Sequence, residues 1–242
     1  MKARAVVLFA VMALPAYTAT ITVGSVSGSF SNAQPLGLAT IFNGSPSAND
    51  AEIWWGDSGV QGVGSGYRFD AIVPPAVSVT IPPNPSNFVQ LADFTHINQP
   101  IPSGTAITGV DLAVNMSFTV DGNPVNQTFN YHITHLETSN ATPCPAFQLS
   151  ATPCDDRVTV SGPSSGTFTI GNVVYTLVLS FQQNNQFTND FITEEQKSNT
   201  AGLYGRFSSR VEDVPAPEPA SFLLLGAGLL VIASLRRRLK EK

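Results

Sequence analysis

The chain has 242 residues, of which 43% are hydrophobic and only 12% are charged. Between residues 20 and 213 it contains five Lys and Arg against fifteen Asp and Glu, which gives this part a net charge of −10 with neutral histidines. So acidic a surface disfavours binding to nucleic acid or anionic lipid, and the length suits one domain with a substantial core.

The N-terminus has the pattern of a secretory signal peptide. Lys2 and Arg4 form a charged start, residues 5–14 are apolar, and small residues follow Pro15. An apolar core this short is typical of a cleaved signal rather than of a spanning helix. We therefore expect residues 1–19 to direct export and residues 20–212 to form the exported domain.

The first half of that domain predicts short strands separated by turns. Residues 21–30 alternate loosely, with glycines that an edge strand tolerates, and residues 51–55 and 67–73 are rich in aromatic and β-branched side chains. Prolines then punctuate a polar connection before a further strand at residues 88–94. No stretch here has the periodicity of a helix.

Two hairpins are predicted in the second half. Apolar residues occupy every second position from Val110 to Val120, and after a turn at residues 121–124 the alternation resumes to Ile133. Residues 167–181 form a second hairpin around Gly171-Asn172.

The remaining elements complete an all-β prediction. We expect residues 182–199 to be loop, with at most one helical turn near Thr193, and residues 201–210 to form the last strand. Short strands without helical crossovers indicate an antiparallel β-sandwich or jelly-roll-like domain.

The chain has two cysteines, Cys144 and Cys154, which enclose a loop of about ten residues. In an oxidising compartment this pair predicts a disulfide. A metal pair or a catalytic thiol is less favoured, because the spacing is too long for Cys-x-x-Cys and no histidine lies close in sequence.

Histidines and acidic residues are the candidates for chemistry. Strand alternation places His132 on a polar face and His135 with the buried side chains. There His135 could meet His96 from another strand, beside Glu137, Asp155 or Asp156. Ordinary hydrogen bonding at strand ends is the simpler interpretation. No metal site and no cofactor are predicted.

Three pairs of adjacent residues have alternative interpretations. The acidic pairs Asp155-Asp156 and Glu194-Glu195 are expected to be solvated, because neighbours on a strand face opposite ways and loop carboxylates stay in water. Trp54-Trp55 places one ring in the core and leaves the other as a candidate sugar platform, although burial of both rings fits equally well.

The last thirty residues, 213–242, combine three features in a fixed order. Prolines flank Glu218 in Pro217-Glu218-Pro219, an apolar run follows at residues 220–235, and a basic cluster closes the chain with Arg236, Arg237 and Arg238. The run would cover roughly 24 Å as a helix, enough to cross a bilayer when the arginines snorkel into the headgroups. The arginines also predict a cytoplasmic C-terminus.

These residues resemble the PEP-CTERM sorting signal of Gram-negative bacteria. The resemblance implies that an exosortase, a membrane-embedded cysteine transpeptidase, recognises Pro217, Glu218 and Pro219 and removes the tail. The protein would be held transiently in the inner membrane and then pass to the cell surface or the exopolysaccharide matrix. An ordinary single-pass anchor is the alternative.

A second motif lies within the exported domain. Thr95-His96-Ile97-Asn98, together with His135, Glu137 and Asn140, resembles the signature of the THxN family of PEP-CTERM proteins, which carry a surface-anchored β domain. That family has no established activity, so the resemblance implies a relative without naming a reaction. Side-chain bonds from Thr95 and Asn98 to nearby backbone, with Pro100 ending the strand, would hold His96 in a tight corner.

Together these observations predict a non-enzymatic exported protein with a structural or adhesive role. Its expected partners are the exosortase, the inner membrane before processing, and exopolysaccharide, and nucleic acid is not expected. One alternative is a carbohydrate-binding module that uses an exposed tryptophan, with or without calcium at the acidic loops. The other is a secreted hydrolase, which would need two carboxylates, or His96, His135 and an acid, in one cleft.

Overall fold

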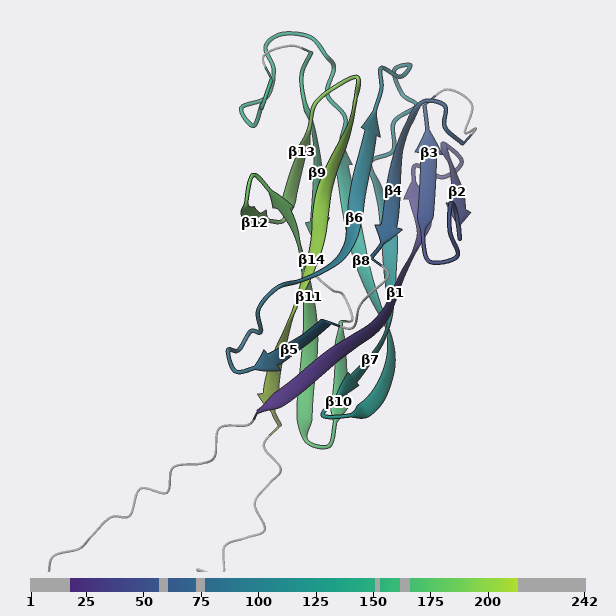
Figure 1. Ribbon diagram of the computed structural model, residues 1–242. Helices are drawn as coiled ribbons and strands as arrows, with labels where there is room; N and C mark the ends of the chain where they lie inside the picture. Colours follow the sequence, from purple (N-terminus) through teal and green to yellow (C-terminus); the bar gives the residue numbers. More distant parts are fainter. Residues whose placement is uncertain (1–17, 57–60, 73–76, 151–152, 162–165, 213–242) are drawn as a thin grey trace, which may run out of the picture.

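The computed structural model describes residues 18–56, 61–72, 77–150, 153–161 and 166–212 (Figure 1). The predicted sorting segment at 213–242 and residues 1–17 of the predicted signal peptide lie outside these ranges. Within them, no helix has the length and apolar character that crossing a membrane requires. The first strand begins at Ala19, the last residue of the predicted signal peptide.

The described residues form two curled antiparallel sheets that pack as a β-sandwich, as predicted. The first sheet has the order β13-β9-β8-β7-β1-β5, with bounds Asp190–Thr193, Asp156–Ser161, Asn123–Leu136, Gly109–Val120, Ala19–Gln34 and Val77–Ile81. The second has the order β10-β11-β14-β6-β4-β3-β2, with bounds Thr167–Ile170, Val173–Gln183, Lys197–Val211, Val89–Asn98, Ser65–Ala71, Ala51–Trp55 and Ala39–Asn43. Strand β12 (Gln186–Thr188) pairs with β11 beside this path.

Both predicted hairpins are confirmed. Strands β7 and β8 pair from Gly109↔Thr134 to Val120↔Asn123, and Asp121 and Gly122 form the turn with φ angles of 50° and 82°. Two positive φ values in succession match the twist of the flanking strands, which explains the Asp-Gly sequence. Strands β10 and β11 join through Gly171-Asn172, where Gly171 has a φ of 61°.

The core lies between the two sheets and follows the alternation in each strand. In β7 the even-numbered residues from Val110 to Val120 are buried, and in β8 the buried positions run from Phe129 through Tyr131 and Ile133 to His135. The opposite sheet contributes aromatic side chains that pack between the layers: Trp55, Tyr67, Phe69, Phe94, Tyr175, Phe181 and Phe207. Because this interior is largely apolar, any polar side chain within it needs a partner.

Strand β1 is an interior strand only where it begins. Residues 19–23 pair with β5, and Ile21 to Val23 pair with β7 on the other side, whereas from Ser25 onward, Gly28 included, β1 pairs with β7 alone, as the glycines of an edge strand suggested. Gly28 also has a packing reason, since a Cβ at this position would lie 2.4 Å from Cδ1 of Phe69. The glycine allows β1 of one sheet to approach β4 of the other.

The prediction of a loop over residues 182–199 is wrong. Strands β12 and β13 and the start of β14 occupy this range, and residues 194–196 carry the chain from one sheet to the other. Strands β2, β5 and β9 were not predicted either. These segments are short or polar, and β13 pairs with β9, a strand about thirty residues earlier, so no local turn marks the pair.

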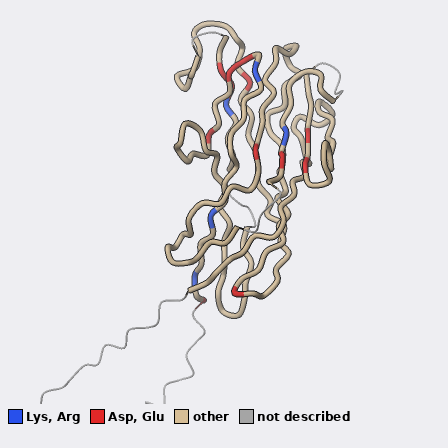
Figure 2. Tube along the Cα trace, viewed as in Figure 1, with Lys and Arg blue, Asp and Glu red and all other residues tan. Residues whose placement is uncertain are grey.

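The two described ends of the chain lie at the same end of the sandwich (Figure 1). The connection from β13 to β14 lies at the opposite end. Most acidic residues of the described chain occupy the half of the molecule away from the two ends (Figure 2). The body therefore has one end near its termini and a distal end enriched in carboxylates.

Candidate functional site

Two buried histidines from different sheets meet near the distal end. His96 lies on the core face of β6 in line with Phe94 and Asn98, and His135 continues the buried face of β8. The exposed fractions are 0% for His96 and 4% for His135, and their ring centroids are 5.2 Å apart. The structure thus brings His135, which strand alternation had placed toward the core, together with His96 from another strand, whereas His132 is exposed and contacts Asp111.

Two aromatic side chains enclose the histidine pair. The ring of Trp55 stacks on His96 at 5.8 Å and meets His135 edge-on at 5.3 Å. Tyr67 contacts both imidazoles, and its hydroxyl lies 2.5 Å from Nδ1 of His135. Nδ1 of His96 lies 2.8 Å from Oγ1 of Thr193. One nitrogen of each imidazole is therefore held by a hydroxyl group.

Three carboxylates adjoin the histidines. Asp156 begins β9, Glu137 follows β8, and Glu195 lies in the β13–β14 connection. Oδ1 of Asp156 accepts a hydrogen bond from the Thr138 amide at 2.8 Å, and Oε2 of Glu137 lies 3.2 Å from Nε2 of His135. We call His96, His135, Glu137, Asp156 and Glu195 the His–carboxylate cluster.

The predicted solvation of the two acidic pairs is wrong for three of the four residues. Asp155, Asp156 and Glu195 are buried, and only Glu194 is partly exposed, where it pairs with Lys197 at 2.5 Å. The sequence around Asp156 gave no sign of this, because its carboxylate is held by the amide of Thr138, 18 residues earlier in the chain.

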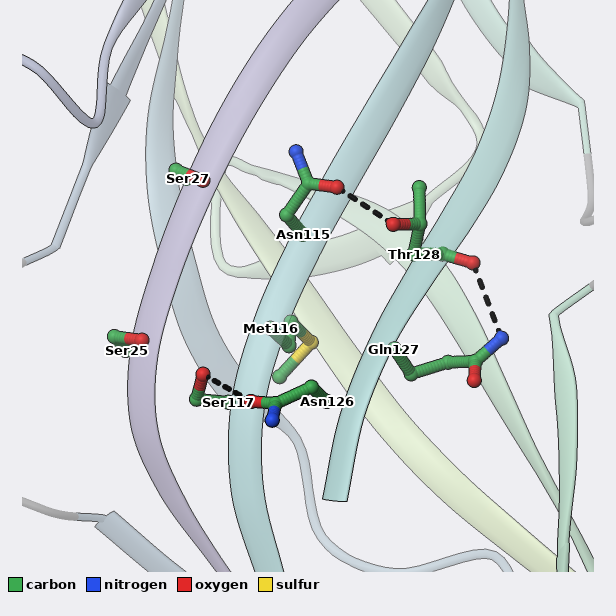
Figure 3. Close-up of a pocket in the computed structure, with 8 residues that line it drawn as sticks. All are labelled: Ser25, Ser27, Asn115, Met116, Ser117, Asn126, Gln127 and Thr128. Atoms are coloured by element: carbon green, nitrogen blue, oxygen red, sulfur yellow. Dashed lines mark hydrogen bonds between the residues drawn. The ribbon is translucent and has the colours of Figure 1, made fainter.

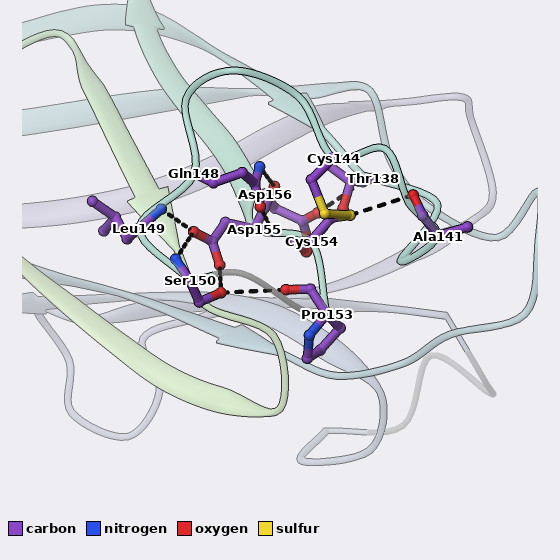
Figure 4. Close-up of a disulfide and its surroundings, with 10 residues drawn as sticks. All are labelled: Thr138, Ala141, Cys144, Gln148, Leu149, Ser150, Pro153, Cys154, Asp155 and Asp156. Carbon is purple, nitrogen blue, oxygen red and sulfur yellow. Dashed lines mark hydrogen bonds between the residues drawn. A yellow bond between two sulfur atoms is a disulfide. The ribbon is translucent and has the colours of Figure 1, made fainter.

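The cysteines form the predicted disulfide, which fixes the loop beside the cluster (Figure 4). Asp155 does not join the cluster, because its carboxylate accepts hydrogen bonds from the amides of Leu149 and Ser150 and from the Ser150 hydroxyl. The Thr138 hydroxyl donates to the carbonyl of Cys154 at 2.9 Å. The bridge and these bonds hold Asp156 at the start of β9.

Several polar atoms of the cluster have no hydrogen-bond partner among the described residues. They are Nε2 of His96, Oδ2 of Asp156 and both carboxylate oxygens of Glu195, together with the nearby Oδ1 of Asn98 and Nε1 of Trp55. The amides of Asn140 and Asn98 do lie close enough to Glu195 to lower its pKa, although burial raises that pKa overall. Buried polar groups without partners are rare and need a physical explanation.

Burial shifts the pKa values of the cluster in opposite directions. It lowers the pKa of His135 to about 4 and that of His96 well below its ordinary value. It raises the pKa values of Glu137 and Asp156 to about 7, and for Asp156 the neighbouring charge of Glu137 adds to the effect. Near neutral pH both imidazoles are therefore neutral and the two carboxyl groups are partly protonated.

Two sets of side chains in the described chain have the spacing of a metal site. One atom from each of His96, His135 and Asp156 lies within 4.8 Å of the others, and the same holds for Glu137, Asp156 and Glu195. A cavity of about 400 Å³ adjoins them and is lined by Glu137, Thr138 and Asn140 together with residues 101–104 and Ala106. Glu137 therefore connects the cluster to the surface.

The predicted family motif converges on this site except at one position. His96, His135 and Glu137 belong to the cluster, and the side chains of Asn98 and Asn140 lie near Glu195. Thr95 faces away and its hydroxyl contacts that of Thr200 at 2.9 Å. The expected tight corner is wrong, because β6 continues in extended form through Asn98.

The tryptophan pair does not provide a surface platform. Trp55 is fully buried against the histidines, and Trp54 is also buried, with its indole nitrogen donating to Oε2 of Glu52 at 3.1 Å. The carbohydrate-binding alternative therefore loses the exposed ring on which it was based. Sequence reasoning also missed Glu195 and Thr193. Thr193 ends strand β13 and Glu195 follows that strand, which has no apolar alternation to mark it in the sequence.

Comparison with known proteins bears on the C-terminal segment. Residues 215–238 match the family model of the PEP-CTERM protein-sorting motif, a range that includes Pro217, Glu218, Pro219 and the three arginines. No curated protein matches the chain. The resemblance to the THxN family stays a prediction. Four residues beyond the end of β14, the chain thus carries a PEP-CTERM protein-sorting motif.

Proposed function

We propose that the β-sandwich is the exported body of a surface protein with a structural or adhesive role and no catalytic activity. The PEP-CTERM motif indicates an exosortase-sorted exported protein that is anchored in a membrane before sorting. We place the final product on the Gram-negative cell surface or in the exopolysaccharide matrix. The observation that carries the proposal is the position of the motif, which begins just after a body closed by β14.

The burial of the cluster supports a non-enzymatic role. Candidate acids and bases do converge, as a hydrolase would need, but both imidazoles lie under Trp55 and Tyr67 with almost no exposure. A general base must come within hydrogen-bond reach of the substrate. Of the cluster, only Glu137 lines the adjoining cavity.

Alanine substitution of Pro217, Glu218 and Pro219 tests the sorting role. In a host with an exosortase, the triple variant should remain full-length and membrane-held, because the enzyme no longer finds its recognition sequence. Immunoblotting of membrane and surface fractions would follow the two species.

A matched control is Glu212→Ala, which removes an exposed acidic side chain just before the motif. This variant should be trimmed and released as the wild type is. Normal trimming of the triple variant would contradict the proposal, as would retention of the wild type in the membrane of the exosortase-bearing host.

A second candidate function is glycan binding on the outer face of β1, β7 and β8. A shallow pocket of about 310 Å³ lies there, lined almost entirely by uncharged polar side chains: Ser25, Ser27, Asn115, Met116, Ser117, Asn126, Gln127 and Thr128 (Figure 3). Ser117 and Thr128 donate to the amide oxygens of Asn126 and Asn115, respectively. Each amide nitrogen is then a potential donor to a sugar hydroxyl.

A glycan array run with and without chelator tests this candidate. If this face binds sugar, signals should persist in chelator and disappear in Asn115→Ala/Asn126→Ala. Equal signals from the wild type and this double variant would exclude the face as a glycan site.

A further inference from the structure

We propose that His96, His135 and Asp156 bind one divalent first-row transition cation, with zinc as its representative. Glu137 and Glu195 lie beside these ligands as further carboxylate donors. This inference goes beyond the proposed sorting and structural role and departs from the sequence-based expectation of no metal site.

His96 is already oriented as a ligand. Its Nδ1 lies 2.8 Å from the Thr193 hydroxyl, whereas its Nε2 is buried without a partner. When Nδ1–H donates to Thr193, the lone pair of Nε2 is free to bind a cation. A ligating histidine usually donates its other ring nitrogen to a fixed group in this way.

His135 has the same arrangement through Tyr67. The Tyr67 hydroxyl lies 2.5 Å from Nδ1 and can accept its proton, which leaves the lone pair of Nε2 directed toward Glu137. In the metal-free state the other tautomer donates Nε2–H to Glu137. A cation would replace that proton and contact the same nitrogen.

Asp156 presents one oxygen to the protein and one to the cluster. Its Oδ1 accepts the Thr138 amide, and its Oδ2 is buried without a partner. Glu195 lies beside it, with the amides of Asn98 and Asn140 close to its carboxylate. Among the described residues, an imidazole nitrogen of His96 and a carboxylate oxygen of Asp156 thus have free lone pairs in one buried volume.

Charge provides an independent argument for a cation. In the described chain, the ion pairs of Lys and Arg involve Asp70, Glu194 and Glu212, none of which belongs to the cluster. Among the residues that the structure describes, Glu137 pairs only with His135, a neutral group when it acts as a ligand. Buried carboxylates are costly unless they are paired or coordinate a metal. A divalent cation would neutralise them.

The donor set selects the class of cation. Two imidazole nitrogens with carboxylate oxygens suit zinc and its neighbours, whereas calcium and magnesium prefer oxygen ligands alone. Bonds of about 2 Å place the atoms around a tetrahedral zinc roughly 3 to 4 Å apart. The ligand atoms here lie within 4.8 Å of one another, so small side-chain shifts would complete the site.

The adjoining cavity gives the cation a route. Glu137 is 19% exposed at its side chain and lines both the cluster and the cavity of about 400 Å³. The disulfide-bridged loop beside it keeps Asp156 in place. Trp55 and Tyr67 enclose the two histidine ligands.

Metal titration of the mature exported protein tests the proposal. After dialysis against chelator, calorimetric titration should give one zinc per chain, whereas magnesium and calcium at the same concentrations should give no signal. Cobalt should bind with the visible absorption of a nitrogen- and oxygen-ligated ion. Zinc should also raise the melting temperature, since it binds only the folded state.

Variants locate the site. Asp156→Asn keeps an oxygen for the Thr138 amide, so it should fold and should lose at least about 10-fold in zinc affinity. His96→Gln should behave alike. The matched control is His132→Gln, which removes the exposed histidine paired with Asp111 and should bind zinc as the wild type does.

Three results would overturn the proposal. They are wild-type protein without stoichiometric zinc, Asp156→Asn with unchanged affinity, and a loss of binding in His132→Gln. Because circular dichroism reports folding separately, a misfolded His96→Gln leaves the decision to Asp156→Asn. A failure to bind zinc would leave the proposed sorting function intact, because the two experiments concern different parts of the chain.

Discussion

Burial raises the pKa values of acidic residues in the cluster and lowers the pKa values of its histidines. The pKa of Asp156 rises from an ordinary 3.8 to about 7, and that of His135 falls from 6.5 to about 4. Below pH 4 the protonated Asp156 favours the folded state, and this contribution is lost as the pH rises to 7. His135 has the opposite pH dependence. Its neutral form favours the folded state above pH 6.5, and this contribution is lost as the pH falls from 6.5 to 4.

Substitution of Asp156 separates these two effects. In chelator-treated protein, Asp156→Asn should gain free energy of unfolding relative to the wild type as the pH rises from 4 to 7, by about 1 to 4 kcal/mol. The reason is that the variant no longer ionises a buried carboxyl group. Urea unfolding of both proteins at pH 4, 5.5 and 7 would measure the difference in free energy of unfolding. A difference that does not change with pH would contradict a pKa of Asp156 raised by burial.

At Gly28, strand β1 of the first sheet packs closely against Phe69 of β4 in the second sheet. Gly28→Ala should lower the free energy of unfolding by about 1 to 3 kcal/mol, because the added Cβ overlaps the ring of Phe69. Ser31→Ala, on an exposed position of the same strand, is the control and should change stability little. Thermal unfolding of both variants checks the prediction, which fails if Gly28→Ala is as stable as the wild type.

At the scale of elements, the disulfide-bridged loop between β8 and β9 carries the acidic side of the cluster. Cys144→Ser/Cys154→Ser should lower the free energy of unfolding by about 2 to 3 kcal/mol, because the unfolded chain regains the entropy of a ten-residue loop. Reduced wild-type protein should show the same loss in urea titrations. A change below about 0.5 kcal/mol would mean that the bridge does not constrain the unfolded chain.

Strands with a regular alternation and a local turn were predictable from sequence. The β7–β8 hairpin combines six alternating apolar residues with an Asp-Gly turn, so pattern and turn chemistry agree. The disulfide followed from two cysteines in an exported chain. His135 was placed toward the core because it continues the alternation of Tyr131 and Ile133.

The acidic half of the cluster was not predictable because its contacts are non-local. Strand β13 has only four residues and pairs with β9, a strand far from it in the chain, so no local partner marks β13 in the sequence. Glu195 is buried only because the chain passes from β13 to β14 at that point. A rule that treats adjacent acidic residues as solvated fails where a loop closes over them.

At the scale of the whole molecule, the fold separates the strand that leads to the sorting motif from the His–carboxylate cluster. Both described ends lie at one end of the sandwich, and the β13–β14 connection that carries Glu195 lies at the other (Figure 1). The sorting motif follows the last strand. The body can therefore be processed at its terminal end without disturbing the cluster at its distal end.

The mass of the intact mature protein from an exosortase-bearing host tests the account most directly. We predict a product that begins near residue 20, ends near Pro217–Pro219, and contains the Cys144–Cys154 disulfide. Its mass fixes both termini at once. A full-length chain of 242 residues with two free thiols would contradict export and sorting together.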